Sequence, residues 1–351
     1  MRQYEVVVYG AYGYTGRLII EACRAKAMKV LISGRDASKL KTLSEKTGYP
    51  FEACDLADSS ALIDLLKKAN LVIHCAGPFH ATAKQMIDAC LETGTHYVDI
   101  TGEYSVFEML AGYDAQAKQK GILVMPGVGF DVVPSDCLAV HLKNRLPKAT
   151  HLQLAFAMSK GGLSRGTART MIDGLGYGSM IRKHGKLIPI GLGEKVMDIN
   201  FGEFTRKAMC IPWGDIATAW RSTGIPNIEV YSAVPESTIR MAGIGGWFNW
   251  LLRKQWLKRY LRKKIDSRPP GPDENKLKMG RSYLWGRVRD DDGNEFEARL
   301  ETISGYLLTA NTATLIAAKL LSTAVQPGYH TPAAYFGEGL ILEVEGSTLS
   351  H

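Results

Sequence analysis

The fold is decided by the stretch Val6-Val7-Val8-Tyr9-Gly10-Ala11-Tyr12-Gly13-Tyr14-Thr15-Gly16. An apolar, β-branched run ends there in three glycines spaced three apart, and residues with helical character follow. In a dinucleotide-binding turn the first glycine allows a tight turn, the second lets backbone approach a pyrophosphate, and the third lets the helix pack close to the sheet. The sequence therefore predicts a nucleotide cofactor. The candidate phosphate-binding residues are Gly10, Tyr12, Gly13, Tyr14, Thr15 and Gly16.

The second predicted strand, residues 30–34, indicates which dinucleotide to expect. Proteins that bind NAD usually end this strand in Asp or Glu, which binds the ribose 2′-hydroxyl, whereas this strand ends in Ser33, Gly34 and Arg35. A guanidinium suits a 2′-phosphate through paired, charge-assisted hydrogen bonds. We therefore predict NADP(H) rather than NAD(H), with Ser33 and Arg35 at the adenine ribose. Asp36 argues for NAD, and a merely solvated Arg35 is the alternative.

Three later segments are also expected beside the cofactor. The strand Phe51–Leu56 would bring Asp55 to the adenine amino group, although Asp55 could instead cap the following helix. A buried fourth strand, in which His74 is expected to be a satisfied core residue, runs into a small-residue turn. Thr101 follows the fifth strand and could donate to the cofactor amide or phosphate. The turn residues expected at the dinucleotide are Cys75, Ala76, Gly77 and Pro78.

The order of strands and helices predicts an α/β protein of two domains. Apolar strands alternate with helical segments up to residues 122–126, which predicts six parallel strands in a Rossmann-like, doubly wound sheet over residues 1–130. The strands at 151–158, 228–234 and 283–289 alternate polar and apolar residues. They predict a second α+β domain, residues 131–304, with a mixed or antiparallel sheet. Helix 305–325 and tail 326–351 are expected to pack back on the nucleotide-binding domain.

Composition restricts the class of protein. With 351 residues, 46% hydrophobic and 22% charged, the chain is long and apolar enough for two folded cores. No signal-peptide pattern is present, and no apolar run approaches the roughly eighteen residues of a membrane span, so we expect a cytoplasmic protein. Six cysteines without C-x-x-C pairs, and no His and carboxylate cluster at ligand spacing, predict reduced thiols and no metal.

The net charge of +8 suggests an anionic partner. Much of the excess lies in residues 244–264, where Lys and Arg alternate with aromatic residues in an amphipathic pattern. One interpretation places this helix on an anionic membrane surface. The favoured interpretation is that its aromatic face covers the protein's own core or a substrate channel while the lysines are solvated. Nucleic acid is not expected, because no other basic and aromatic patch or binding module accompanies the segment.

Several sequence strings, in order along nearly the whole chain, resemble the saccharopine-dehydrogenase-like NADP-binding oxidoreductases, and most closely their trans-acting enoyl reductase branch. The strings are Gly10–Leu18, Ser33–Arg35, Cys75–Phe79, Tyr97–Glu103, Gly129–Asp136, Ser164–Thr167, Pro212–Asp215, Gly271–Gly286 and Thr331–Ala334. The resemblance implies a two-domain, NADPH-dependent reductase of an enoyl bond in an apolar acyl or polyketide-like substrate. Members closer to true saccharopine reductases would instead reduce an imine derived from an amino acid. Arg165 departs from the smaller residue expected in its string.

A third possibility, from the basic segment, is a scaffold that retains NADP without turnover and associates with lipid. If the chain is a reductase, the reacting groups should lie at the carboxyl ends of the parallel strands. Tyr104 could deliver a proton, and Asp131 follows the sixth strand. Arg165, from the second domain, could bind a substrate carboxylate or thioester carbonyl, as could Lys160. The alternatives are a buried aromatic for Tyr104 and exposed charges for Arg165 and Lys160.

Two further expectations concern the loop after the sixth strand and assembly. Ser135 and Asp136 are expected to cap the helix that follows this loop. The substrate is expected to be a small and apolar molecule, and a homodimer is the assembly considered.

Overall fold

The computed structural model describes residues 2–159, 162, 164–244 and 249–351. The chain divides into two compact units, each with its own sheet. The first unit contains Met1–Val133 and Tyr306–Tyr335, and the second contains Pro134–Gly305 and Phe336–His351. In the described part of the chain, none of the helices combines the length and apolar composition that a bilayer crossing requires.

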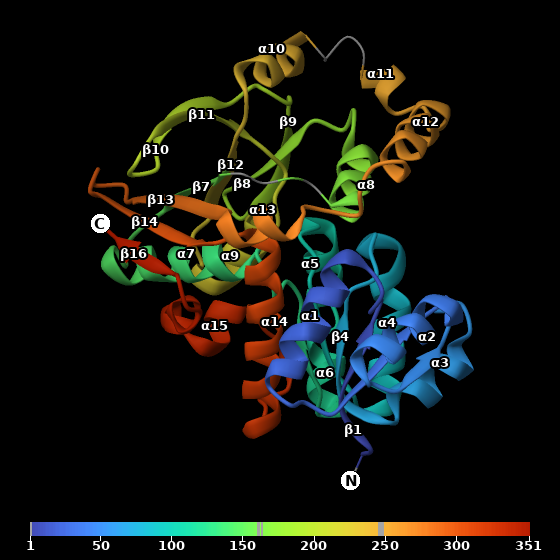
Figure 1. Ribbon diagram of the computed structural model, residues 1–351. Coiled ribbons are helices and arrows are strands. Elements are labelled where there is room, and N and C mark those ends of the chain that lie inside the picture. Colours follow the sequence, from blue (N-terminus) through green and yellow to red (C-terminus); the bar gives the residue numbers. More distant parts are fainter. Residues whose placement is uncertain (1, 160–161, 163, 245–248) are drawn as a thin grey trace. The chain divides into compact units, whose positions relative to one another are not determined.

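The first unit is built on a seven-stranded parallel sheet in the order β15-β6-β5-β4-β1-β2-β3. Figure 1 labels β1 and β4 of this sheet and helices α1 to α6 around it. The six predicted strands are present, and the doubly wound fold is confirmed. The seventh, β15, pairs with β6 and comes from the C-terminal part of the chain. The strands are β1 (Tyr4–Tyr9), β2 (Val30–Gly34), β3 (Phe51–Ala53), β4 (Ala69–His74), β5 (His96–Asp99), β6 (Leu123–Met125) and β15 (Gly328–Tyr329).

Helices cover both faces of this sheet, which explains the uninterrupted apolar runs of its central strands. Val7 and Tyr9 of β1 pack in a core with residues of α3 to α6, while Val6 and Val8 point to the other face and are equally buried. The helices are α1 (Tyr14–Ala25), α2 (Ala37–Thr47), α3 (Ser59–Leu66), α4 (Phe79–Thr93), α5 (Tyr104–Ala111), α6 (Asp114–Lys120), α14 (Gly305–Ser322) and α15 (Pro332–Phe336).

The long C-terminal helix α14 is fastened to the loop that follows β6. The Thr312 hydroxyl donates to the Val128 carbonyl at 2.7 Å, and the Thr309 hydroxyl accepts from the Phe130 amide at 3.0 Å. The predicted helix therefore packs on the nucleotide-binding unit as expected. Residues 336–351 do not: they belong to the second unit, where β16 pairs with the edge strand β14. This corrects the expected placement of the whole tail, and β16 also covers an edge that would otherwise be open.

The second unit contains a nine-stranded mixed sheet. Its main path runs β10-β11-β12-β7-β13-β14-β16, with β8 joined to β12 and β9 to β8. Only the β12 and β7 pair is parallel, so the predicted mixed sheet is confirmed. Its strands are β7 (His151–Ser159), β8 (Ser179–Lys183), β9 (Lys186–Ile190), β10 (Val196–Asn200), β11 (Thr205–Cys210), β12 (Asn227–Ala233), β13 (Arg281–Arg289), β14 (Glu295–Ile303) and β16 (Thr348–Ser350).

The helices of the second unit differ from expectation in the basic segment. Residues 244–264 do not form one helix: α10 ends at Ile244, α11 spans only Asn249–Leu252, and α12 begins at Gln255 after an extended Lys254. Trp247 and Phe248 lie outside the described residues. The helices are α7 (Val133–Arg145), α8 (Arg165–Gly174), α9 (Asp215–Thr223), α10 (Glu236–Ile244), α11 (Asn249–Leu252), α12 (Gln255–Asp266), α13 (Glu274–Met279) and η2 (Glu338–Glu343).

Candidate cofactor and active site

The turn between β1 and α1 has the geometry that its glycines predict. Gly10 has φ +83°, a conformation that side chains strongly disfavour. A Cβ on Gly10 would also lie 2.9 Å from the Ala76 nitrogen and 2.9 Å from the Cys75 carbonyl carbon. Glycine is therefore required at position 10 for two reasons: the turn needs a positive φ, and the turn after β4 approaches too closely for a side chain. This contact joins two of the predicted cofactor-binding segments.

The first turn of α1 is open to an anion. A Cβ on Gly16 would lie 2.5 Å from the Gly10 carbonyl oxygen, so the helix starts directly against the turn. Its N-cap, Gly13, has no side chain to accept from the first helical amides, and the first turn contains no acidic residue. The amides at the start of the helix, including those of Tyr14 and Thr15, can therefore serve the phosphates of a dinucleotide. The turn and the first turn of α1 thus fit the pyrophosphate of the predicted cofactor.

Tyr12 and Tyr14 each contact a neighbour that the sequence pattern did not identify. A Cβ on Gly34 would lie 2.7 Å from Cε1 of Tyr12, so the Tyr12 ring rests on the end of β2. The Tyr14 ring meets the ring of Tyr306 edge to face, with centroids 5.1 Å apart. Tyr306 lies on α14, nearly three hundred residues along the chain, and no local signal could have predicted this pair.

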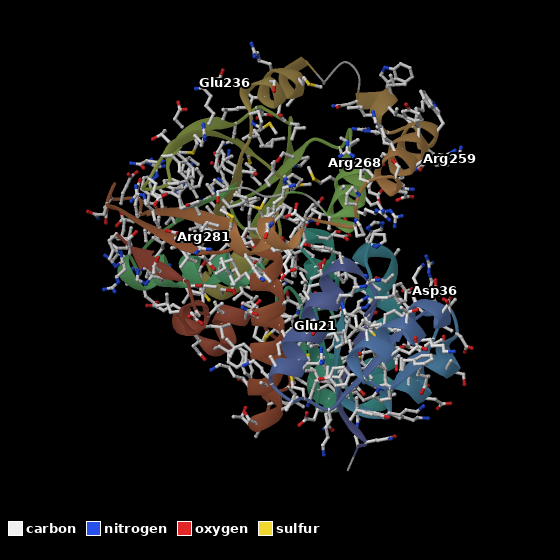
Figure 2. All side chains as sticks on the ribbon, viewed as in Figure 1. Glu21, Asp36, Glu236, Arg259, Arg268 and Arg281 are labelled. Atoms are coloured by element: carbon white, nitrogen blue, oxygen red, sulfur yellow. The ribbon has the colours of Figure 1, made fainter. Side chains whose placement is uncertain are left out.

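At the end of β2, Arg35 is the charged residue that remains available to bind a cofactor phosphate. The Asp36 carboxylate caps α2 by accepting from the Lys39 amide at 3.1 Å, and it pairs with the Lys39 ammonium at 2.8 Å. These contacts lower the pKa of Asp36. Asp36, labelled in Figure 2, is therefore engaged with its own helix. Among the described residues the exposed Arg35 guanidinium has no salt bridge.

Ser33 and Asp55 have structural partners. The buried Ser33 hydroxyl donates to the Glu52 carbonyl at 2.7 Å, which links β2 to β3. The Asp55 carboxylate accepts from the Ala57 amide at 3.0 Å, whereas Asp58 caps α3 by accepting from Ala61. The alternative that Asp55 caps this helix is therefore wrong, because the cap lies one turn later. Its contact with adenine stays a prediction.

The turn after β4 leads into a helix whose N-terminus is already occupied. The Glu103 carboxylate accepts from the Phe79 amide at 2.8 Å and the His80 amide at 3.1 Å, and it contacts His80 Nδ1 at 2.8 Å. The Glu103 side chain is therefore held at the start of α4 and is mostly buried. Its partners lie more than twenty residues away, so no spacing rule identifies them. The carboxylate neutralises the positive end of α4.

Asp99 joins the two loops at the carboxyl ends of β5 and β6. Its buried carboxylate accepts from the Tyr97 hydroxyl at 2.5 Å, the Thr101 amide at 3.0 Å and the Gly127 amide at 2.9 Å. Burial raises the pKa of Asp99 to about 6 despite these hydrogen bonds. Thr101 is fully buried and its hydroxyl accepts from the Glu103 amide at 3.1 Å. Its contact with cofactor stays a prediction.

His74 is a core residue, as expected, although it is only partly satisfied. Its Nε2 pairs with the Thr82 hydroxyl at 3.0 Å, while Nδ1 has no partner among the described residues. Burial lowers the pKa of His74 to about 3, so the ring is neutral. A neutral imidazole can remain buried without a counter-charge.

Asp131 and Tyr104 follow the ends of β6 and β5 in the first unit. A Cβ on Gly102 would lie 2.5 Å from Oδ2 of Asp131, so the carboxyl group packs directly on this glycine. Burial raises the pKa of Asp131 to about 7, which lets it hold a proton near neutral pH. Tyr104 begins α5 and is half-buried. Both predicted residues thus belong to neighbouring loops at the edge where this fold binds its ligands.

The predicted residues of the second unit have structural partners. Arg165 Nε donates to the Arg268 carbonyl at 2.6 Å and its amide donates to the Pro270 carbonyl, which fixes the start of α8. Ser135 lies inside α7 and donates to Asp215 at 2.7 Å, while Asp136 accepts from Ser222. The N-cap expectation for Ser135 and Asp136 is therefore wrong, because α7 begins two residues earlier. Lys160 lies outside the described residues.

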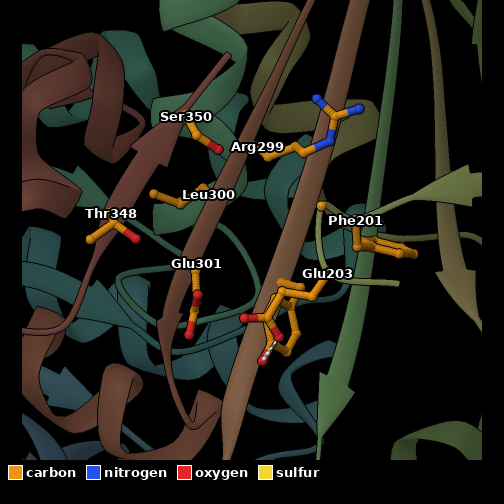
Figure 3. Close-up of a pocket in the computed structure, with 9 residues that line it drawn as sticks. Phe201, Glu203, Arg299, Leu300, Glu301, Thr348 and Ser350 are labelled. Carbon is orange, nitrogen blue, oxygen red and sulfur yellow. Dashed lines mark hydrogen bonds between the residues drawn. The ribbon is translucent and has the colours of Figure 1, made fainter. Parts of the chain in front are cut away.

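A small pocket lies within the second unit, between the turn after β10 and strands β13, β14 and β16 (Figure 3). Its volume is about 140 Å³, and the Tyr283 hydroxyl donates to Glu203 there at 3.3 Å. Typical ligand pockets measure about 300–1,000 Å³ and are mostly apolar. This pocket is smaller and contains two carboxylates, so it does not fit an apolar acyl ligand. Its lining residues are Phe201, Gly202, Glu203, Tyr283, Arg299, Leu300, Glu301, Thr348 and Ser350.

Comparison with known proteins agrees with the geometry of the first unit. Residues 6–125 match the family described as the saccharopine dehydrogenase NADP binding domain. The predicted resemblance and the NADP(H) cofactor are thereby confirmed. Among the described residues, no group of three or more His, Cys, Asp and Glu side chains could hold a metal ion.

Three relatives are similar over a longer stretch than these residues. A saccharopine dehydrogenase-like oxidoreductase of Homo sapiens is 30% identical over 52% of this chain and 48% of its own length. A lipid droplet localized protein of Caenorhabditis elegans is 31% identical over 50% and 46%. A trans-acting enoyl reductase of Mycobacterium ulcerans is 29% identical over 41% and 36%. The matched region thus covers about half of these relatives or less.

A solved structure matches the whole chain. Apo histidine-tagged saccharopine dehydrogenase (L-Glu forming) from Saccharomyces cerevisiae covers 99% of this chain and 100% of its own, with a TM-score of 0.68. The sequences are 15% identical, so this similarity shows the fold alone.

Proposed function

We propose that this protein is an NADPH-dependent oxidoreductase that reduces the C=C bond of an apolar enoyl substrate. The observation that carries the proposal is the geometry of the β1–α1 turn and of the residues beside it, which would bind the cofactor. Gly10 and Gly16 bring the start of α1 against the β4 turn, the helix N-terminus is uncapped by any side chain, and Arg35 is available at the end of β2. The similarity to a trans-acting enoyl reductase supports the reaction class.

Different residues of the first unit would bind different parts of the cofactor. The α1 amides would bind the pyrophosphate, and Arg35 would pair with the 2′-phosphate through charge-assisted hydrogen bonds. Because Asp36 is held by Lys39, it does not offer the free carboxylate that would favour a 2′-hydroxyl. When bound, NADPH would supply the hydride.

Reduction of an enoyl bond also needs a proton for the substrate's α-carbon. Asp131 fits this role better than Tyr104, because burial holds its pKa near neutrality, where the group can both carry and release a proton. Tyr104, at the start of α5, would orient the substrate beside it. Arg165 is not part of this proposal, because its Nε is used to hold the chain at Arg268.

Imine reduction is the second candidate, favoured by the similarity to saccharopine dehydrogenase-like oxidoreductases. The two reactions require different substrates, so one panel separates them. NADPH consumption is measured with enoyl thioesters of increasing chain length and with ketoacid and amine pairs. Saturated thioester as product supports enoyl reduction, whereas a secondary amine supports the second candidate. If NADPH binds but no substrate is turned over, a non-catalytic, NADP-retaining scaffold replaces both.

Assembly and location are not part of this test. A homodimer and a cytoplasmic location stay predictions. Size-exclusion chromatography with light scattering checks the first, and fractionation of cells checks the second.

A further inference from the structure

Helix α12 exposes its aromatic side chains and buries its aliphatic ones. Trp256 and Tyr260, one turn apart, are 57% and 62% exposed, whereas Leu257, Leu261 and Ile265 are half-buried and form a separate row on the helix. The favoured interpretation is that the aromatic face covers the protein's own core or a substrate channel; its first part is wrong for these rings, and the second stays a prediction. Trp250 of the neighbouring α11 is also 62% exposed. Monomeric proteins rarely expose grouped aromatic side chains without a binding partner.

The same face of α12 carries unpaired positive charge. Arg259 and Lys263 lie three and seven residues after Trp256, which places them on the helical face of Trp256 and Tyr260, and Lys264 borders it. All three are exposed, and no ion pair involves them among the described residues. Lys254 lies over the Trp250 ring at 5.7 Å. Figure 2 shows Arg259 on the outer side of α12.

The nearby acidic groups are already paired, so they do not neutralise this face. Asp266 pairs with Arg169 of α8 at 2.5 Å, and Asp173 of α8 pairs with Arg262. The Asp173 bridge lies where α12 packs on α8, on the far side of the helix from Trp256. Asp266, seven residues after Arg259, lies beside the face and has Arg169 as its partner. The face of Trp256, Arg259, Tyr260 and Lys263, with Lys264 at its edge, is called the α12 outer face below.

Two other basic residues in the segment have a structural role instead. Lys258 is only 3% exposed, its ammonium donates to the Asp173 carbonyl at 2.6 Å, and it lies 4.7 Å from the centroid of the Tyr177 ring. Arg253 donates to the Gly176 carbonyl at 2.8 Å. Both residues attach the α11 and α12 segment to α8 and its following turn. A test that removed them would disturb the fold as well as the surface charge.

We propose that the α12 outer face, together with Trp250, docks on an anionic phospholipid surface. Aromatic rings insert at the level of the headgroups, and the surrounding Lys and Arg pair with lipid phosphates and carboxylates. The charge and the aromatic exposure fit this partner together, because duplex nucleic acid would pair its phosphates with the charge and leave the three exposed rings uncovered. Single-stranded bases could stack on such rings, and the oligonucleotide arm of the test below detects that alternative. The proposal is independent of the proposed reductase reaction.

Vesicle flotation tests the proposal with the full-length protein. We expect binding to vesicles of phosphatidylcholine mixed with phosphatidylserine, weak binding to phosphatidylcholine alone, and release at high salt. Each basic residue near an anionic membrane contributes about fivefold to partitioning, so R259Q/K263Q/K264Q should weaken binding by roughly a hundredfold. W250A/W256A should weaken it by at least about tenfold, because both rings leave the interface.

A charge-matched control uses exposed cations at the other end of the second unit's sheet. The variant K183Q/K186Q/R289Q removes the same charge from the β8–β9 turn and the end of β13, and it should bind vesicles like the wild type. Circular dichroism and thermal unfolding confirm that each variant is folded. The proposal is overturned if the wild type does not float with anionic vesicles or if both triple variants lose binding equally. Salt-sensitive binding to an oligonucleotide without vesicle binding would also overturn it, in favour of a nucleic-acid surface.

Discussion

Replacement of Arg35 by Glu should convert the cofactor preference. Arg35 is exposed and has no salt bridge among the described residues, so its replacement should leave the folded state intact. A charge-assisted contact of this kind contributes about 1.5–3 kcal/mol, which corresponds to roughly 10- to 150-fold in affinity for NADPH. Repulsion between Glu and the 2′-phosphate adds to the loss. The affinity for NADH should change by less than about fivefold, because an exposed charge alone contributes no more than about 1 kcal/mol.

Titration of protein fluorescence with NADPH and with NADH measures both dissociation constants. The control is Lys41→Glu, which reverses a second exposed charge on α2 without touching the end of β2. It should shift both affinities slightly and equally. Equal loss of NADPH and NADH affinity in Arg35→Glu, or the same NADPH loss in Lys41→Glu, would refute the assignment of Arg35 to the 2′-phosphate.

Three other residues give predictions that chemical denaturation can check. Gly10→Ala should lower the free energy of unfolding by about 3 kcal/mol, because the residue has a positive φ and the new Cβ would meet backbone atoms at 2.9 Å. Gly48→Ala should lower it by only about 1–2 kcal/mol, because Gly48 has a positive φ but its Cβ would lie in open space. Asp99→Ala should cost about 3 kcal/mol, because two amides and the Tyr97 hydroxyl lose their buried acceptor. The folded-state pKa of Asp131 is raised from 3.8 to about 7, so its contribution to stability is full below pH 3.8 and is lost as pH rises through about 7. Wild type should therefore lose stability relative to Asp131→Asn across this range.

Each of these predictions has a contrary result. Equal destabilisation by the two glycine substitutions would show that the contact with the β4 turn is unimportant. A neutral Asp99→Ala would mean that water replaces its carboxylate. A difference in stability between wild type and Asp131→Asn that does not change with pH would mean that Asp131 titrates at its ordinary pKa.

The sequence predicted the parts of the first unit that depend on local geometry. The positive φ of Gly10 follows from the turn that must join a buried strand to a helix, and the strand ends follow from runs that are buried on both faces. β15 was not predicted because two residues carry no pattern. The roles of Glu103 and Ser135 were not predicted either. Their partners lie 24 and 80 residues away, and hydrogen bonds at such separations leave no periodic trace in a single sequence.

The basic segment shows why hydrophobic periodicity alone could not orient a helix. α12 carries two stripes at helical spacing, one aliphatic and one aromatic, and either could have formed the buried side. In the structure Leu261 and its aliphatic neighbours are half-buried, and Lys258 of the same helix donates to a carbonyl of α8. Trp256 and Tyr260 then remain beside Arg259 and Lys263 in a separate row. Because one stripe suffices to attach the helix, the second stripe is not explained by folding, and its combination of rings and cations is best explained by an anionic surface outside the protein.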